Sequence, residues 1–388
     1  MKKQWRLLVI ALFFAFLFLP LLQQVTGLLA IKALGGEEEE VKRPIFRFDE
    51  WFDRKWQQEF ETWNDLHIGM RPWMIRTANQ INLSLFGRIN QSKGTRVCIG
   101  QKDVLFEEVY VTEYTNPRFY NEEYLRSYTW GVFRLQQLLE LHGVPFLLII
   151  APSKAEIYPE YLPQHSDSEG REEKVSAYQQ IRPLLDKYQI NYLDGHELFR
   201  KWKEEGAPWL FARGGTHWNY YGAGKIIHLA LDNIAKQRGK DFDNVEVTSY
   251  TTDSEPHGTD NDLEMVLNRW FSGGTNQEQI HPKFVRHERG NLPRLMMIGD
   301  SFAHTLITIL EEQHLFENCE LLYYSKRRFS WPASTNSPID MSQLDFQKEM
   351  LDKDAVIMEI SENNLPKFGF GALRAAVTDL EAADPVKI

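Results

Sequence analysis

The stretch LMMIGDSFAHTLI, residues 295–307, decides the fold of this chain. Its first four residues are uninterrupted apolar side chains, which is typical of a buried β-strand, and the residues from Phe302 onward follow the apolar spacing of an amphipathic helix. A strand that runs directly into a helix is half of a βαβ unit. The sequence Gly-Asp-Ser lies at the junction, so Ser301 is predicted to sit where the strand ends and the helix begins.

The same alternation of short apolar segments and longer amphipathic segments extends on both sides of this stretch. The predicted strands span residues 145–151, 190–193, 295–298, 320–324 and 355–360, and the predicted helices span residues 120–142, 170–188, 221–236, 302–314 and 368–382. Such alternation predicts an α/β fold in which helices cover both faces of a parallel sheet. Residues 97–106 predict a hairpin, and residues 248–290, rich in Asp, Asn and Gly, predict a long insertion or loop.

The N-terminus carries a membrane signal. Residues 7–31 contain no charged side chain, and Lys2, Lys3 and Arg6 precede them. About 20 apolar residues span a bilayer, and the basic flank predicts a cytoplasmic N-terminus. We therefore expect an uncleaved single-pass anchor in the cell membrane, with the rest of the chain in the periplasm or at the cell surface. A cleaved signal peptide is the alternative.

Three regions follow from these patterns. Residues 1–36 are the predicted anchor, residues 37–96 an aromatic-rich helical entry segment, and residues 97–388 the α/β domain. The charged run GGEEEEVKR, residues 35–43, predicts a tether. Six aromatic residues recur in the entry segment at roughly helical spacing, which predicts a packing face; they are Phe48, Trp51, Phe52, Trp56, Phe60 and Trp63.

Composition excludes several classes of function. The net charge of −10 and the lack of a Lys/Arg stripe argue against a nucleic-acid partner. The histidines show no metal-ligand spacing, and GAGK at residues 222–225 lacks the other residues of a P-loop, so we expect neither a metal nor a nucleotide cofactor. Cys98 and Cys319 are compatible with buried thiols or with one disulfide, and spacing alone does not choose between them.

In an open parallel sheet, ligands bind beyond the carboxyl ends of the strands. Ser301 is predicted to lie there at a helix N-terminus, where N–H groups and the helix dipole stabilise an alkoxide or a tetrahedral oxyanion. Helix capping by Asp300 or Ser301 is the alternative. His217, in GTHWNYYGAGKII at residues 215–227, precedes an apolar helix that would mount it as the base, and a surface or capping histidine is the alternative.

The order of several blocks resembles that of a known family. The chain resembles the SGNH-hydrolase-like O-acetyltransferases of exopolysaccharide biosynthesis, the alginate AlgX and AlgJ group, over most of its length after the anchor. The blocks are WFDRKWQQEFETWNDLHIGMRPWMIRTANQINLSLFG (51–87), VCIGQKDVLF (97–106), APSKAEIYPEYLP (151–163), GTHWNYYGA (215–223), GTDNDLEMVL (258–267) and MMIGDSFAHTL (296–306). The resemblance implies a circularly permuted SGNH-hydrolase-like fold, since the histidine block precedes the serine block.

The resemblance also implies roles for residues. Ser301 would be the nucleophile that holds an acetyl group, and His217 the base that activates first the serine and then a sugar hydroxyl. The family pattern Asp-x-His-Trp has Gly215 at the aspartate position here, and the hydrolase spacing falls on Gly214, also glycine. Loss of that aspartate in a serine protease lowers turnover by about 10⁴.

Three outcomes are open for the missing aspartate. A carboxylate from elsewhere replaces it, with Asp194, Asp262 and Glu359 as candidates; a backbone carbonyl orients His217 in a slower Ser-His dyad; or the site is degenerate. Candidate oxyanion or substrate groups are the backbone N–H of Ser301 and the side chains of Asn363, Asn364 and Lys154.

Three functions are therefore weighed. The first is an O-acetyltransferase that modifies an exopolysaccharide or cell-surface glycan, with the acetyl group supplied by a membrane-bound O-acyltransferase-type partner that the family context implies. The second is a catalytically impaired glycan-binding or assembly protein, suggested by Gly214 and Gly215. The third is an O-acetyl esterase that uses the same serine and histidine.

Overall fold

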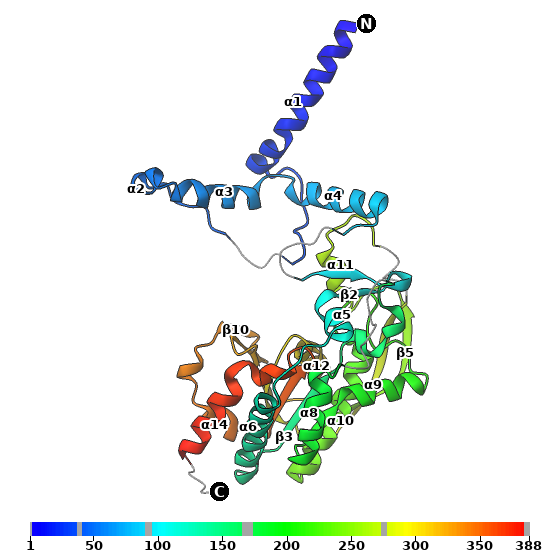
Figure 1. Cartoon of the computed structure of the whole chain (residues 1–388), viewed down its shortest axis with the longest axis vertical. Coiled ribbons are helices and arrows are strands. Elements are labelled where there is room, and N and C mark those ends of the chain that lie inside the picture. The colour runs from blue at the N-terminus through cyan, green and yellow to red at the C-terminus, as the bar shows by residue number, and fades with distance from the viewer. Residues whose placement is uncertain (1, 37–40, 90–94, 165–173, 273–277, 384–388) are drawn as a thin grey trace. The chain divides into compact units, whose positions relative to one another are not determined.

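The computed structural model describes residues 2–36, 41–89, 95–164, 174–272 and 278–383. The chain divides into two compact units (Figure 1). The first comprises residues 1–97 with 264–272, and the second comprises residues 98–263 with 273–388. Residues 37–40 of the predicted tether, and residues 170–173 at the start of a predicted helix, lie outside the described residues.

The first unit is helical. Its helices are α1 (Lys2–Thr26), α2 (Phe48–Phe52), α3 (Lys55–His67) and α4 (Arg71–Phe86). An 18-residue window within residues 4–26 of α1 has a mean hydropathy of 2.4, and within the described residues this is the one helix long and apolar enough to cross a membrane. A secretory signal sequence would have the same properties, so this finding agrees with both an anchor and a signal peptide.

The aromatic residues of the entry segment do not form the buried packing face that their spacing predicts. None of the six is buried, and Phe48 and Phe52 expose 70% and 72% of their surface. The rings contact one another instead: Trp56 stacks on Phe60 with centroids 5.0 Å apart, and Phe48 meets Phe52 edge to face. The periodicity predicted the helices correctly, but the expectation that their aromatic side chains are buried was wrong.

The second unit contains a seven-stranded sheet in the order β10-β9-β8-β7-β11-β3-β4. The strands from β8 to β4 run parallel, and β9 and β10 extend the edge antiparallel. The bounds are β3 (Phe146–Ala151), β4 (Tyr192–Asp194), β7 (Arg294–Gly299), β8 (Asn318–Tyr323), β9 (Arg327–Trp331), β10 (Thr335–Pro338) and β11 (Ala355–Ser361). The predicted α/β sheet is thus confirmed, with a mixed rather than a purely parallel edge.

Helices cover both faces of this sheet, as predicted. Alternate residues of β3 point into two hydrophobic clusters, with Leu147 and Ile149 in one and Phe146 and Leu148 in the other. The first cluster includes apolar residues of α10 (Tyr220–Arg238) and α12 (Phe302–Glu312). The second includes those of α6 (Glu122–Leu141), α8 (Ala177–Lys187) and α14 (Ala372–Ala383). Every residue of β3 is buried because both faces are covered.

The remaining elements are short or lie outside the sheet. They are β1 (Val97–Ile99), β2 (Leu105–Glu107), α5 (Glu108–Thr115), α7 (Lys154–Ile157), α9 (Gly195–Glu204), β5 (Asn244–Asp253), α11 (Asp262–Val266), β6 (Gln279–His287) and α13 (Phe346–Leu351). β1 and β2 pair, as the hairpin prediction requires. Residues 248–290 are not only loop, because β5 and β6 form a long antiparallel pair there; their polar, exposed faces concealed the strand alternation.

Candidate active site

Ser301 lies at the junction predicted from the sequence, between β7 and α12. Its backbone is helical, with φ −66° and ψ −21°, and its side chain makes no capping hydrogen bond. Asp300 caps the helix instead, because its Oδ1 accepts a hydrogen bond from the N–H of Phe302 at 3.1 Å. The Ser301 hydroxyl therefore does not cap the N-terminus of α12.

Asp300 connects the serine to the neighbouring strand. Its Oδ2 accepts hydrogen bonds from the N–H and the hydroxyl of Ser361, at 3.0 and 2.6 Å, and from the amide of Asn364 at 2.8 Å. The carboxylate is completely buried, and a buried carboxylate with this many donors holds its surroundings in place. Asp300 thus fixes Ser301 relative to the end of β11.

His217 lies in the segment that leads into α10. The helix begins at Tyr220, with the side chain of Asn219 accepting from the N–H of Gly222 at 3.0 Å. Trp218 is fully buried, and its indole N–H donates to the carbonyl oxygen of Phe302 at 3.1 Å. This bond ties the histidine segment to the first turn of α12, one residue past Ser301, and the ring of His217 packs against that of Phe302.

A carboxylate orients His217. Nδ1 of His217 lies 2.6 Å from Oδ2 of Asp262, whose Oδ1 accepts from the N–H groups of Thr216 and Leu263 at 2.8 and 2.7 Å. Because a carboxylate only accepts, Nδ1 carries the proton of this hydrogen bond. Nε2 is buried and has no hydrogen-bond partner within the described residues, so it is the nitrogen available to take a proton.

Gly215 leaves room for the segment that leads to Asp262. A Cβ atom at this residue would lie 2.5 Å from the carbonyl oxygen of Thr259 and 3.0 Å from the backbone of Asp260. The loop that carries Asp262 therefore packs where a side chain at Gly215 would be. The segment at residues 259–262 fills this space and delivers a carboxylate to His217.

Lys154, a candidate for contacts with substrate, binds backbone carbonyl groups of the protein instead. It is buried, and its ammonium donates to the carbonyl oxygens of Ala212, Arg213 and Gly215. Burial lowers the pKa of this amine to about 7, while the charges of Asp262 and Asp260 oppose the shift. Lys154 thus anchors the backbone of the segment that leads to His217.

Neither of the other two candidate carboxylates has a hydrogen bond or ion pair with His217 among the described residues. Asp194 caps α9, accepts a hydrogen bond from the hydroxyl of Tyr178 at 2.7 Å, and pairs with Arg182. Glu359 is fully buried in β11, beneath Gly299. Burial, and secondarily the charge of Asp300, raise the pKa of the Glu359 carboxyl well above its usual range, which favours the neutral acid there.

The two candidate asparagines also have partners. The amide nitrogen of Asn364 donates to Asp300 and to the hydroxyl of Ser361, and its oxygen accepts from Lys367 at 2.9 Å. The amide oxygen of Asn363 accepts from Arg118 at 3.4 Å. Asn364 is thus a structural link between Ser361 and Asp300, and Asn363 faces Arg118.

Two residues near the site were missed by the sequence analysis. Tyr324 follows β8 in a left-handed conformation, φ 49°. Burial raises the pKa of its phenol, and hydrogen bonds with the side chain and backbone of Ser301 oppose that rise. Tyr324 was the last residue of a predicted strand, so the rule that ligands bind at carboxyl ends of strands identifies it in retrospect.

Glu107, at the end of β2, is the second missed residue. Its Oε2 accepts from the hydroxyl of Thr216 at 3.3 Å, and burial raises the pKa of its carboxyl while the nearby His217 lowers it. No sequence signal points to it, because β2 is short and belongs to no catalytic motif. Its position beside Thr216 adds a second carboxyl group to the surroundings of His217.

The arrangement suits nucleophilic acyl transfer. Ser301 stands at a helix N-terminus with a hydroxyl that does not cap the helix, His217 is oriented by Asp262, and Nε2 of His217 has no hydrogen-bond partner within the described residues. No group of three His, Cys, Asp or Glu residues able to hold a metal ion occurs among the described residues. Cys98 and Cys319 are both free thiols.

Comparison with known proteins identifies the family to which the chain belongs. Residues 97–306 match the model of the family described as SGNH hydrolase-like domain, acetyltransferase AlgX. The matched region is just over half of the chain and contains His217, Asp262 and Ser301. No curated protein matches the chain.

Several solved structures have a related fold. The O-acetyltransferase domain of Pseudomonas putida AlgJ is 16% identical, with a TM-score of 0.46 over 75% of this chain and 100% of that chain. Pseudomonas aeruginosa AlgX is 15% identical, with a TM-score of 0.42 over 72% and 66%. Bacillus cereus PatB1 is 14% identical, with a TM-score of 0.42 over 70% and 97%. Likenesses of this degree say nothing about substrate or activity.

Proposed function

The chain belongs to the family of SGNH hydrolase-like acetyltransferases described for AlgX, and on that premise we propose that it is an O-acetyltransferase that works outside the cytoplasm. It transfers acetyl groups to hydroxyls of an exopolysaccharide or cell-surface glycan through an acetyl ester of Ser301. The observation that carries this proposal is His217, which is paired through Nδ1 with Asp262 and whose Nε2 lacks a hydrogen-bond partner within the described residues.

In the first half-reaction, Nε2 of His217 takes the proton of the Ser301 hydroxyl as the oxygen attacks the carbonyl carbon of an acetyl donor. The imidazolium is stabilised by Asp262, and the tetrahedral oxyanion by N–H groups at the start of α12 and by the positive end of the helix dipole. The bond to the leaving group breaks, and His217 returns the proton to that group. Acetyl-Ser301 remains.

The second half-reaction runs the same chemistry with a sugar. His217 takes the proton of a sugar hydroxyl, whose oxygen attacks the acetyl carbon of acetyl-Ser301. The ester bond to Ser301 then breaks, and the proton passes from His217 to the serine oxygen. The product is an O-acetylated sugar, and the enzyme is restored.

The N-terminal region gives this chemistry a location. We propose that residues 1–36 anchor the chain in the membrane, that residues 37–96 form the entry segment, and that residues 97–388 form the catalytic domain outside the cytoplasm. A single span provides no route for acetyl groups across a bilayer. A membrane-bound O-acyltransferase-type partner would therefore supply the donor.

The test uses the full chain in detergent with p-nitrophenyl acetate as the donor. Intact-mass spectrometry and peptide mapping are expected to find one acetyl group on Ser301, absent from Ser301→Ala and His217→Ala. Added neutral oligosaccharides are then expected to become acetylated as the serine ester is lost. Release of acetate without sugar acetylation would indicate an esterase, and no acetyl above the Ser301→Ala background would refute both enzymatic functions.

A further inference from the structure

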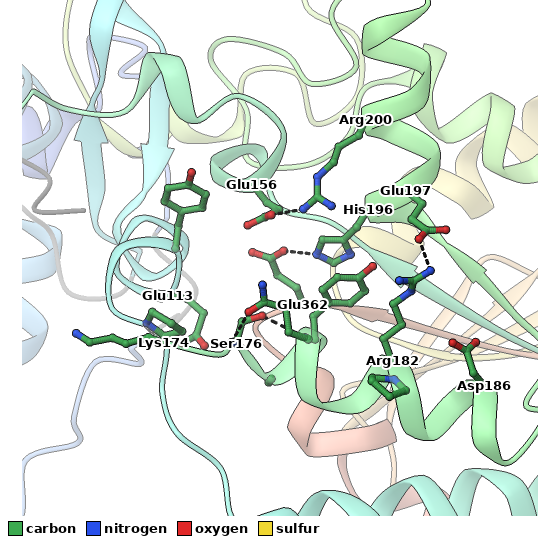
Figure 2. Close-up of a pocket in the computed structure, with 16 residues that line it drawn as sticks. Glu113, Glu156, Lys174, Ser176, Arg182, Asp186, His196, Glu197, Arg200 and Glu362 are labelled. Carbon is green, nitrogen blue, oxygen red and sulfur yellow. Dashed lines mark hydrogen bonds and ion pairs between the residues drawn. The ribbon is translucent and has the colours of Figure 1, made fainter. Parts of the chain in front are cut away.

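A polar cavity of about 570 Å³ lies near the carboxyl ends of β11, β3 and β4, where α8 and α9 contribute its walls. Neither Ser301 nor His217 is among the residues that line it. Its volume falls within the range of about 300–1,000 Å³ that is typical of small-molecule sites. Figure 2 shows charged side chains from several elements converging on this cavity.

A buried pair, His196 and Glu362, lines the cavity. Nε2 of His196 lies 2.6 Å from Oε2 of Glu362, and the two side chains expose only 1% and 8% of their surface. Tyr178 stacks on the ring of His196 with centroids 3.7 Å apart. Hydrogen bonds from His196 and from Ser153 lower the pKa of Glu362 against the opposing effect of burial. The pair is thus held rigidly.

In the part of the chain that the structure describes, the other ring nitrogen of His196, Nδ1, lacks the hydrogen-bond partner that a bound ligand could provide. Nδ1 is buried and has no hydrogen-bond partner within the described residues; the nearest carboxylate oxygen, on Asp194, is 3.9 Å away. Nδ1 accepts a hydrogen bond when the ring is neutral and donates one when it is charged. A hydroxyl group satisfies either state, because it both donates and accepts.

The charges of the cavity disfavour an anionic ligand. Five carboxylates and three cations line it among the described residues: Glu113, Glu156, Asp186, Glu197 and Glu362, and Lys174, Arg182 and Arg200. Both guanidinium groups are already paired, Arg200 with Glu156 and Arg182 with Glu197 (Figure 2). An acid group would therefore meet surplus negative charge and neutralised arginines, whereas hydroxyl groups can bond to the carboxylate and guanidinium edges.

We propose that this cavity binds a sugar unit that carries no anionic group, as one unit of the acceptor glycan. The inference rests on the proposed acetyltransferase function and specifies its substrate class. The cavity would hold a sugar beside the unit that is acetylated, and so fix which hydroxyl reaches Ser301.

The topology places the cavity within reach of the serine. Glu362 directly follows Ser361, which donates to Asp300, the neighbour of Ser301. β11 lies between β7, which leads to Ser301, and β3, which leads to Ser153. Neighbouring strands are about 4.8 Å apart, so these two strand ends are separated by about 10 Å. The proposal accordingly has a single glycan chain occupying both sites at once.

The test measures sugar binding by saturation-transfer NMR with the full chain in detergent, in the Ser301→Ala background. The probes are neutral tetrasaccharides of glucose, mannose and galactose, and tetragalacturonate as the acidic counterpart. Pro183→Trp fills the cavity from an exposed position on α8 and removes a proline from a helix interior. His196→Gln keeps a donor for Glu362 and removes Nδ1. Leu141→Trp, at an exposed residue of α6 outside the cavity, is the matched control.

At least one neutral tetrasaccharide is expected to bind about tenfold more tightly than tetragalacturonate, and about tenfold more tightly to the control than to either cavity variant. Equal binding by the cavity variants and the control, preference for the acidic probe, or no binding of any neutral probe would overturn the inference. Acetylation of Ser301, measured in parallel on the unaltered chain, tests the proposed function alone. Sugar binding without that acetylation would support the cavity and refute the acetyltransferase.

Discussion

Oδ2 of Asp262 lies 2.6 Å from Nδ1 of His217, although 45 residues separate them in the chain. Gly215 stands two residues before His217 in the chain, and Asp262, the first residue of α11, provides the carboxylate beside the imidazole. This contact gives His217 the carboxylate partner that a Ser-His-Asp site requires. The following predictions test its parts.

Gly215→Asp is expected to lower activity rather than raise it, although it places a carboxylate two residues before His217. Its Cβ would meet the carbonyl oxygen of Thr259 at 2.5 Å, and the loop that carries Asp262 would have to move. Overpacking of this kind costs about 1–3 kcal/mol. The rate of acetyl-Ser301 formation measures the loss of activity, and urea denaturation measures the loss of stability. A more active Gly215→Asp variant would contradict the assignment of Asp262.

Trp218→Phe is expected to lower the free energy of unfolding by about 1–3 kcal/mol and to slow acetyl-Ser301 formation. The change removes the hydrogen bond from the indole to the carbonyl oxygen of Phe302 and leaves a void in the core. Trp202→Phe makes the same chemical change at a buried residue and serves as the control. If both variants react equally fast, Trp218 has no role in aligning His217.

Lys154→Met is expected to destabilise the segment before His217. Carbonyl oxygens of Ala212, Arg213 and Gly215 would lose their donor, and each buried unsatisfied carbonyl costs about 1–3 kcal/mol. Faster amide hydrogen exchange at residues 212–217 is the specific readout. Exchange unchanged from the unaltered chain would show that these contacts do not hold the segment.

Asp260 is expected to make stability depend on pH. Burial raises its pKa from 3.8 to about 6, so the folded state binds a proton more tightly than the unfolded state. The resulting stabilisation is fully present below about pH 4 and is lost as the pH rises through about 6, on the order of 3 kcal/mol in total. Asp260→Asn keeps an oxygen to accept from the N–H of His257 and is expected to lack this change. The free energy of unfolding is measured by urea denaturation across this pH range for the variant and for the unaltered chain. If it changes with pH in the same way for both proteins, the expectation is contradicted.

The sequence predicted the elements that obey simple periodicity. β3, β7 and β11 were found because strands buried on both faces read as unbroken apolar runs. β5 and β6 were missed because most of their side chains are polar or exposed. The helices of the entry segment were found, but their aromatic faces were expected to be buried and are not.

The sequence predicted which residues form the candidate site better than it predicted which of them contact one another. Ser301 and His217 stood in recognisable motifs, whereas Asp262 was one of three carboxylates that spacing did not separate. Only the backbone geometry around Gly215 shows why the loop at residues 259–262 approaches. Lys154 and Asn364 were expected near substrate because they follow strand ends, and their polar atoms bind the protein itself instead.

The most direct test is the rate of acetyl-Ser301 formation in Asp262→Asn. The oxygen of an asparagine can still accept from Thr216 and Leu263, as Oδ1 of Asp262 does, while its amide would face Nδ1 of His217 and impose the wrong tautomer. Asp260→Asn, a nearby buried carboxylate with no contact to the His217 ring among the hydrogen bonds of the described residues, is the matched control. The account predicts a fall of about 10⁴ in Asp262→Asn and a rate near that of the unaltered chain in the control. A rate for Asp262→Asn within a few-fold of the control would contradict it.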